Sequence, residues 1–163
     1  MPTLDDFKTL FETIRKQTGL DMLVPDADGL VSIRVDDQYN VNLQFIAEAA
    51  KILCFIEVAT LPDNAGAAVY RDLLTGDFFG KDTAGGYFTM EGETNTVIYN
   101  YMFDFAPAAA DPENFVETLE NILQLVDIWA DRINGNLAGE ASAKQDDDTK
   151  ATPSPSSSLF FRP

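Results

Sequence analysis

The side chains that could do acid–base chemistry here are carboxylates, because the sequence has no histidine and a single cysteine, Cys54. Paired carboxylates act as general acid and base in hydrolases, and an Asp-x-Asp-Gly start occurs in calcium loops. Three short clusters place carboxylates close together in the sequence: Asp26-x-Asp28-Gly29, Asp36-Asp37 and Glu91-x-Glu93. A small enzyme that uses carboxylates is therefore one function class to consider.

The context of these clusters favours solvated turns over chemistry. A calcium loop needs a ligand at its fifth position and glycine at its sixth, where this sequence has Leu30 and Val31. The other two pairs fall at predicted turns, where Asp and Glu are common. The glycines at 80, 85 and 86 lack the lysine and spacing of a phosphate loop. We expect no metal site here and no cofactor.

The absent residue types exclude further chemistry. Without histidine there is no Ser-His-Asp or Cys-His arrangement and no histidine metal ligand. One cysteine allows no intrachain disulfide and no multi-cysteine metal site. Cys54 lies in the most apolar predicted strand, where an unreactive core thiol is expected. The composition favours a binding protein, and we predict that the protein is not an enzyme.

The charge of the chain limits its partners. Its 163 residues include 27 Asp and Glu against 11 Lys and Arg, a net charge of −16, and the pI is near 4.1. Nucleic acid and anionic membrane surfaces are disfavoured as partners, because both bind through concentrated basic surfaces. The acidic start has no apolar signal-peptide core, and no apolar run is long enough to span a membrane. We expect a cytoplasmic protein.

The composition changes after Asn136. Residues 1–136 hold 23 of the 27 acidic residues and form the predicted domain. Residues 137–163, which include the run GEASAKQDDDTKATPSPSSS, lack apolar periodicity, and we predict a disordered acidic and Ser/Pro-rich tail. The tail closes with Leu-Phe-Phe-Arg-Pro, which is either a short docking motif or an incidental terminus.

Periodicity places the elements of the domain. Apolar residues at 3–4 spacing predict a first helix over residues 4–18, with Thr3 as its N-cap and Gly19 as its stop. Alternation over residues 31–35 and 39–45 predicts an antiparallel hairpin with one wet face. Residues 52–59 are apolar on both faces, which is typical of a central strand that is covered on both sides.

The second half of the domain continues the pattern. We predict a helix over residues 64–79, strands over 87–91 and 96–105, and a last helix of about 22 residues. That helix starts at Asp111-Pro112, carries a near-heptad apolar seam that includes Trp129, and ends at Gly135. The order α-β-β-β-α-β-β-α predicts an α+β fold with a five-stranded antiparallel sheet packed with helices.

Aromatic residues exceed what three helices can cover. Ten of the twelve Phe, all five Tyr and the single Trp lie in the domain. A large apolar area without an intrachain partner usually marks a protein–protein surface. We predict a homodimer interface on the central helix and the strand after it, formed by Val69, Leu73, Phe78, Phe79, Tyr87 and Phe88.

Three stretches carry a resemblance to a known family. They are the Asp28-Gly29 turn with the hairpin VSIRVDDQYNVNLQF, the segment LLTGDFFGKDTAGGYFTMEGETNTVIYNYMF, and the C-terminal helix with Phe115 and Trp129. Over about residues 4–135 the chain resembles the class I type III secretion chaperones, the CesT/SycE-like (Tir chaperone) family of small acidic bacterial cytosolic proteins. The Ser/Pro tail lies outside that pattern.

The resemblance implies a virulence-associated chaperone that keeps its bound partner locally unfolded. A homodimer would bind the N-terminal segment of a secreted effector, keep it secretion-competent and deliver it to the secretion ATPase, without hydrolysing anything. The effector would wrap around the dimer in extended form, adding a strand to a sheet edge and placing apolar side chains in grooves.

The candidate groove residues lie on the first helix and the hairpin. They are Phe7, Leu10, Phe11, Ile14, Val31, Ile33, Val41 and Leu43. The alternative is that these side chains are simply the core between helix and sheet. A second reading of the whole protein is a general protein-binding adaptor or regulator of the same fold, with no role in secretion.

Overall fold

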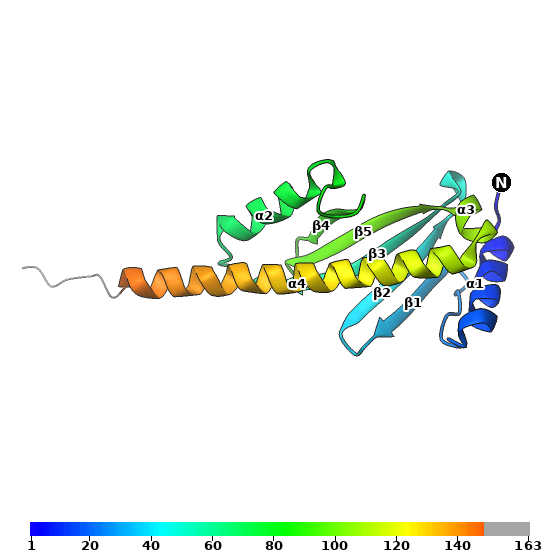
Figure 1. Ribbon diagram of the computed structural model, residues 1–163, viewed down its shortest axis with the longest axis horizontal. Helices are drawn as coiled ribbons and strands as arrows, with labels where there is room; N and C mark the ends of the chain where they lie inside the picture. Colours follow the sequence, from blue (N-terminus) through cyan, green and yellow to red (C-terminus); the bar gives the residue numbers. More distant parts are fainter. Residues whose placement is uncertain (149–163) are drawn as a thin grey trace, which may run out of the picture.

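The centre of the fold is a five-stranded antiparallel sheet, which confirms the predicted α+β class. The computed structural model describes the backbone of residues 1–148 and the side chains of residues 1–143. The sheet order is β1-β2-β3-β5-β4 (Figure 1). The strands are β1 (Leu30–Val35), β2 (Tyr39–Ile46), β3 (Lys51–Thr60), β4 (Tyr87–Glu91) and β5 (Thr96–Asp104).

Within residues 1–148, four helices and two short 3₁₀ turns connect and cover the strands. They are α1 (Leu4–Thr18), η1 (Ala47–Ala49), α2 (Ala67–Asp77), η2 (Phe78–Gly80), α3 (Phe105–Ala110) and α4 (Pro112–Asp148). The ends of α1 match the prediction: Thr3 forms a capping box with Asp6, and Gly19 takes φ 72° at the C-cap. None of the helices in the described part of the chain has the length and apolar character required to cross a membrane.

The short helix α3 was not predicted, and Phe105 begins it instead of ending the last strand. Its ring is buried and lies 5.4 Å from the ring of Phe45 on β2. Pro107 and four alanines follow in this helix, and a segment of six residues is too short to display helical periodicity. The chain then turns at Asp111, whose carboxylate caps α4 by accepting a hydrogen bond from the Asn114 N–H.

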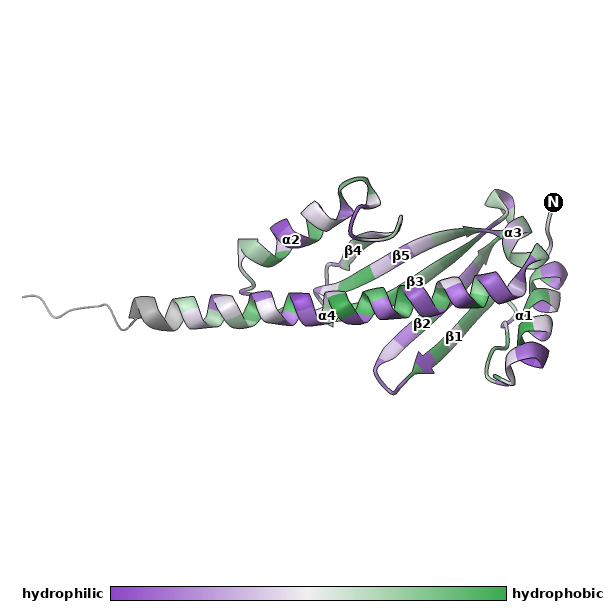
Figure 2. Cartoon of the chain, viewed as in Figure 1, coloured by the Kyte–Doolittle hydropathy of each residue, from purple (hydrophilic) through white to green (hydrophobic). Residues whose placement is uncertain are grey.

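The core lies between one face of the sheet and the helices α1 and α4 (Figure 1). Buried aromatic rings join these layers: Phe7 of α1 stacks on Phe45 at 5.1 Å, and Phe115 of α4 meets Phe103 of β5 at 4.7 Å. Apolar and polar residues alternate along α4 (Figure 2), and its buried large side chains recur at helical spacing: Phe115, Ile122, Val126, Trp129 and Ile133. This arrangement confirms the predicted seam.

The opposite face of the sheet is less covered than the sequence predicted. β3 lies in the middle of the sheet, as expected. However, Leu53 and Phe55 on its second face are only half-buried, and neighbouring Met102 is 39% exposed. No described helix packs on that face, because all helices gather on the other side or at the ends of the sheet.

The last helix extends beyond the predicted boundary at residue 136. α4 continues to Asp148, so residues 137–148 are helical and not disordered as predicted. Leu137 packs against the core, and Glu140 reaches the start of α2, where its carboxylate accepts hydrogen bonds from Gly66 N (2.7 Å) and Ala68 N (3.2 Å). The predicted disorder of residues 149–163 lies outside the described residues.

Glu140 supplies the N-cap that α2 lacks in its own sequence, since Gly66 at that position has no side chain. We expect Glu140→Ala to lower the free energy of unfolding by about 0.5–2 kcal/mol, the usual value of an N-cap. Urea unfolding followed by circular dichroism measures this change. Glu117→Ala removes a carboxylate from an exposed position of the same helix and should shift the midpoint little. Equal midpoints for the two variants would contradict the capping role.

Candidate functional site

The Asp26 cluster is the entry turn of the first hairpin. One carboxylate oxygen of Asp26 accepts hydrogen bonds from the backbone N–H groups of Asp28 and Leu30, each at 2.9 Å. This Asp26 oxygen therefore accepts the backbone hydrogen bonds of the turn itself, as in an Asx turn. This geometry explains the Asp-x-Asp-Gly pattern without a metal ion.

The other two carboxylate pairs also shape turns. Asp36 and Asp37 both take positive φ, 51° and 54°, in the β1–β2 turn. Glu91 accepts hydrogen bonds from the N–H groups of Glu93 and Thr94 and from the Thr94 hydroxyl, and these bonds lower the pKa of the Glu91 carboxyl. A general acid needs the opposite shift, toward neutral pH.

The other two features considered from the sequence, Cys54 and the glycine loop, also have structural explanations. Cys54 is fully buried, and burial raises the pKa of its thiol to about 12, which leaves it protonated and inert at neutral pH. In the glycine loop, a Cβ at Gly80 would lie 2.9 Å from the Gly85 backbone, and one at Gly86 would collide with the Tyr99 hydroxyl group. The loop needs glycine because it folds closely on itself and on β5.

An apolar cavity of about 400 Å³ opens between α1, the loop after it, the β1–β2 hairpin and α4. We call it the α1–α4 groove. The lining consists of Phe11, Ile14, Leu20, Met22, Leu23, Ile33, Arg34, Val35, Asp36, Val41, Leu43, Phe115, Val116, Leu119, Glu120 and Leu123. Its charged residues are one cation, Arg34, and two anions, Asp36 and Glu120. Beside it, β1 forms an edge of the described sheet.

Five of the eight predicted groove residues line this cavity. They are Phe11, Ile14, Ile33, Val41 and Leu43, and all except Ile33 are at most 2% exposed. They form the floor of the groove and belong to the core at the same time. Of the other three, Phe7 and Val31 are fully buried in the core, while Leu10 lines a separate, more open cavity of about 690 Å³ between α1 and α3.

The accessible side of the groove was missed from the sequence. Leu20 and Met22, in the loop after α1, are 42% and 61% exposed. Val116, Leu119 and Leu123 of α4 are half-buried beside them. The apolar loop LDMLV after the Gly19 stop was a signal, since large apolar residues in a loop need a partner.

A second apolar surface lies on α2 and the turn that follows it. Leu74, Phe78 and Phe79 are 73%, 65% and 92% exposed, and Tyr87 of β4 is 44% exposed. Phe79 also has φ 55°, an unusual conformation for an aromatic residue. We call these four residues the α2 patch. Of the other residues predicted at a dimer interface, Val69 and Leu73 are buried within the chain, and Phe88 is half-buried against Trp129.

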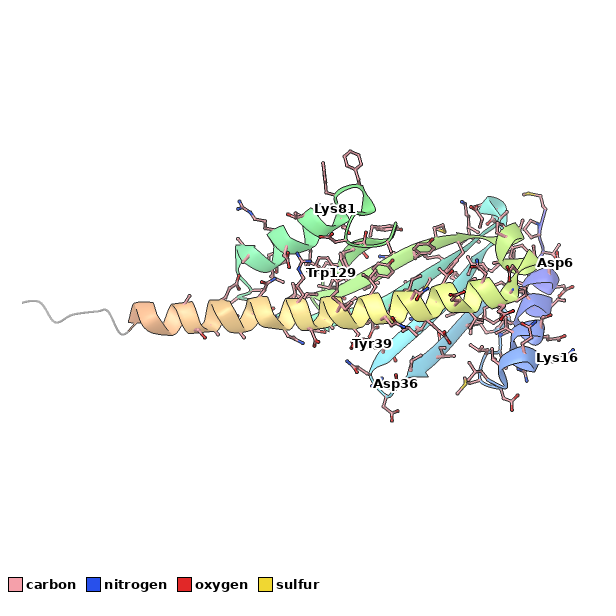
Figure 3. The ribbon with its side chains drawn as sticks, in the orientation of Figure 1. Asp6, Lys16, Asp36, Tyr39, Lys81 and Trp129 are labelled. Carbon is pink, nitrogen blue, oxygen red and sulfur yellow. The ribbon has the colours of Figure 1, made fainter. Side chains whose placement is uncertain are left out.

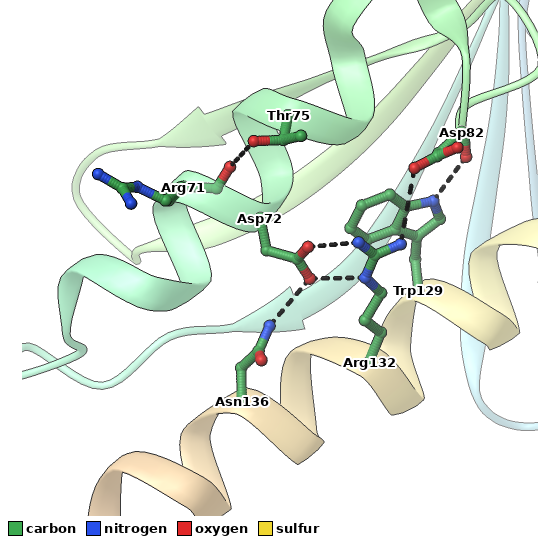
Figure 4. Close-up of polar contacts among 7 residues, drawn as sticks. All are labelled: Arg71, Asp72, Thr75, Asp82, Trp129, Arg132 and Asn136. Carbon is green, nitrogen blue, oxygen red and sulfur yellow. Dashed lines mark hydrogen bonds and ion pairs between the residues drawn. The ribbon is translucent and has the colours of Figure 1, made fainter.

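Trp129 and Arg132 hold this α2 region onto α4 (Figures 3 and 4). The Trp129 indole N–H donates to the Asp82 carbonyl at 2.9 Å, and the Arg132 guanidinium lies 4.4 Å above the indole ring. Arg132 and Asn136 also donate to the Asp72 carboxylate of α2, and the Arg132 bond lowers the pKa of that carboxyl. These contacts fix the position of α2 and of the exposed Phe78–Phe79 turn relative to α4.

Residues 9–130 match the sequence profile of the Tir chaperone protein (CesT) family. Comparison with curated protein sequences gives no match.

Among solved structures, the ExsC–ExsE complex superposes with a TM-score of 0.67 at 24% identity, covering 80% of this chain and 95% of that chain. The HopA1–SchA chaperone–effector complex gives 0.60 at 16% identity, covering 79% and 95%. The ExoU–SpcU complex from the type III secretion system of Pseudomonas aeruginosa gives 0.55 at 14% identity, covering 80% and 96%. At these identities the likeness concerns the fold.

Proposed function

The chain belongs to the Tir chaperone protein (CesT) family of type III secretion chaperones, and from this we propose that it binds the N-terminal segment of a secreted effector and keeps it secretion-competent. The observation that carries the proposal is the α1–α4 groove, an apolar cavity of about 400 Å³ with exposed Leu20 and Met22 at its mouth. Such a cavity on a strongly charged chain is typical of a binding site for apolar side chains.

The position of the groove suits an extended peptide. β1 is an edge of the described sheet, so a peptide strand can pair with its backbone. Alternate side chains of that strand would point toward the groove, because successive side chains of a strand face opposite ways. Each Leu, Ile or Phe anchor that becomes fully buried contributes about 1.5–3 kcal/mol before ordering costs.

The charge of the chain favours a basic partner. A net charge of −16 attracts cationic segments and speeds their association at low salt. Asp36 and Glu120 place two of these charges at the groove. The proposed ligand is therefore an extended segment that combines large apolar residues with Lys or Arg.

Affinity purification of the tagged full chain from its native bacterium, with the secretion system expressed, tests this function. We expect one dominant secreted protein, and limited proteolysis of the complex should leave a protected fragment from its N-terminal region. Recovery of regulators that are not secreted would contradict the proposal and favour the adaptor alternative. A secretion ATPase is a further expected partner when the effector is bound.

We also propose that the chain forms a homodimer through the α2 patch. Leu74→Asp should then raise the dimer dissociation constant about a hundredfold, because a symmetric interface loses two leucine contacts worth about 1.5 kcal/mol or more each. Sedimentation equilibrium measures the constant. Leu20→Asp, the same change at an exposed leucine of the groove, is the control and should leave the dimer intact. A dimer equally stable in both variants would rule out the α2 patch.

This function needs no catalysis. The carboxylates of Asp26 and Glu91 accept hydrogen bonds within turns and Cys54 is buried, which supports a binding role for the protein. We therefore expect the protein in the bacterial cytoplasm, where a chaperone of this kind binds its effector before secretion.

A further inference from the structure

The last fifteen residues of the chain differ in charge from the rest of the sequence. All 27 Asp and Glu precede residue 149, whereas residues 149–163 contain Lys150 and Arg162 and no acidic residue. These fifteen residues, called the C-terminal tail from here on, also contain Leu159, Phe160 and Phe161 in a row. The tail is therefore a cationic segment with large apolar side chains, attached to a strongly acidic domain.

The α1–α4 groove is complementary to that composition. Its lining is largely apolar, its mouth has the exposed side chains of Leu20 and Met22, and Asp36 and Glu120 lie at its border. Apolar rings would gain burial in the groove. Its two acids outnumber its one base, Arg34, so the charge of the lining favours a neighbouring cation.

The length of the tail allows it to reach the groove of its own chain. Leu123 is the groove residue on α4 that lies nearest the end of that helix. At 1.5 Å per residue, Asp148 is about 38 Å further along α4. The twelve residues from Asp148 to Phe160 span about 40–43 Å when extended. The tail can thus return along α4 to the near end of the groove.

A second apolar cavity, between α2 and β4, fits the tail less well. Its volume is about 180 Å³, less than half that of the groove. Its one carboxylate, Asp77, already accepts a hydrogen bond from the Phe88 N–H at 3.0 Å. This cavity therefore offers less room for two phenylalanine rings and no second acid for Arg162.

We propose that residues 159–162 of the C-terminal tail occupy the α1–α4 groove of their own chain, with the phenylalanine rings among its apolar side chains and Arg162 near Asp36 and Glu120. The tail then acts as an internal competitor that covers the groove until a ligand displaces it. That the displacing ligand is an effector rests on the proposed function, whereas the contact itself does not.

The four methionines allow a direct test of the contact in the full chain. Met22 lies at the groove, Met90 beside the α2–β4 cavity, and Met102 on the sheet face opposite α4. A spin label on Ser157→Cys is selective, because Cys54 is fully buried. In methyl-labelled methionine NMR spectra we expect the label to broaden the Met22 signal and to leave Met90 and Met102 sharp. Broadening of Met90 or Met102 alone, or of no signal, would overturn the proposal.

Two further samples separate the alternatives. Adding Phe160→Asp and Phe161→Asp to the labelled chain should restore the Met22 signal, whereas Ser154→Asp with Ser156→Asp adds the same charge and should not. Broadened Met22 in both variants would overturn the role of the aromatic residues. In a mixture of spin-labelled and isotope-labelled copies, broadening would mean exchange of tails between copies and would overturn the intrachain contact.

Competition is measured separately. If the tail covers the groove, Phe160→Asp with Phe161→Asp should tighten binding of the captured effector segment about threefold or more, because the competent fraction of the groove rises. Unchanged affinity together with a broadened Met22 signal would refute the competition while leaving the contact established. If neither the unchanged chain nor this variant binds the effector segment at the groove, the result would instead contradict the proposed function.

Discussion

Met22→Asp combined with Leu119→Asp should weaken binding of the effector segment a hundredfold or more while the chain stays folded. Both side chains line the α1–α4 groove, and Met22 is 61% exposed, so the change acts on the mouth of the groove. Two lost apolar anchors correspond to about 3–6 kcal/mol, which is two or more powers of ten in the dissociation constant. Fluorescence anisotropy with a labelled effector segment measures it.

The matched control for this double variant is Met102→Asp, which places the same new charge on the sheet face opposite α4. Its affinity should stay within a factor of about two or three of the unchanged chain. If Met102→Asp abolishes binding and the groove variant does not, the effector lies on the open sheet face. Circular dichroism of each variant verifies the fold.

The choice of these residues differs from what the sequence favoured. Phe11→Asp and Leu43→Asp are the natural tests of a groove placed on the first helix and hairpin. Both side chains are 1% exposed, so a buried unpaired carboxylate would destabilise the whole domain. Variants at the mouth of the groove separate loss of binding from loss of fold.

Trp129→Ala should lower the free energy of unfolding by about 3–5 kcal/mol, the usual cost of removing a large buried aromatic side chain. Trp129 is 1% exposed, its ring meets Phe88 at 4.8 Å, and its indole donates to the Asp82 carbonyl. The variant also removes the contact between Trp129 and Gly76 of α2, where there is no room for a Cβ.

Urea unfolding followed by circular dichroism measures this loss, since Trp129 is the only tryptophan and its fluorescence disappears with it. Ile128→Ala, at the neighbouring position and 64% exposed, should change stability by no more than about 0.5 kcal/mol. A small effect of Trp129→Ala would mean that α2 is held to the domain by its other contacts alone.

Most elements of the fold could be predicted from local sequence patterns. The alternation in residues 31–45 predicted the β1–β2 hairpin, and the capping residues Thr3 and Gly19 predicted both ends of α1. These signals are local because each depends on residues within a few positions of one another. The order of the strands in the sheet was not predicted, since β3 pairs with β5 and not with β4, the next strand along the chain.

The end of the last helix depended on distant contacts. Gly135 is a normal helix stop in sequence, yet nothing lies near its Cβ position and α4 continues through it. What supports the continuation is Leu137 against the core and Glu140 at the start of α2, 74 residues away in sequence. A pattern in one segment cannot reveal a cap that it provides for another.

Five of the eight residues predicted to form an effector groove line the α1–α4 groove, and their role in binding stays a prediction. Periodicity identifies the apolar face of a helix or strand, and it placed Phe11 and Leu43 on faces that line this cavity. It does not reveal how much of that face a second element covers, so core and groove looked alike. The exposed partners, Met22 and Leu119, come from a loop and from α4, which meet the hairpin only in the folded chain.

Photo-crosslinking from the groove tests the central claim most directly. A photoreactive amino acid replaces Met22 in the full chain, or Met102 as the control, in the native bacterium with its secretion system expressed. We predict that position 22 forms adducts with the N-terminal segment of a secreted protein and that position 102 does not. Adducts of that segment with position 102 alone, or none with position 22 while the complex is present, would contradict the account.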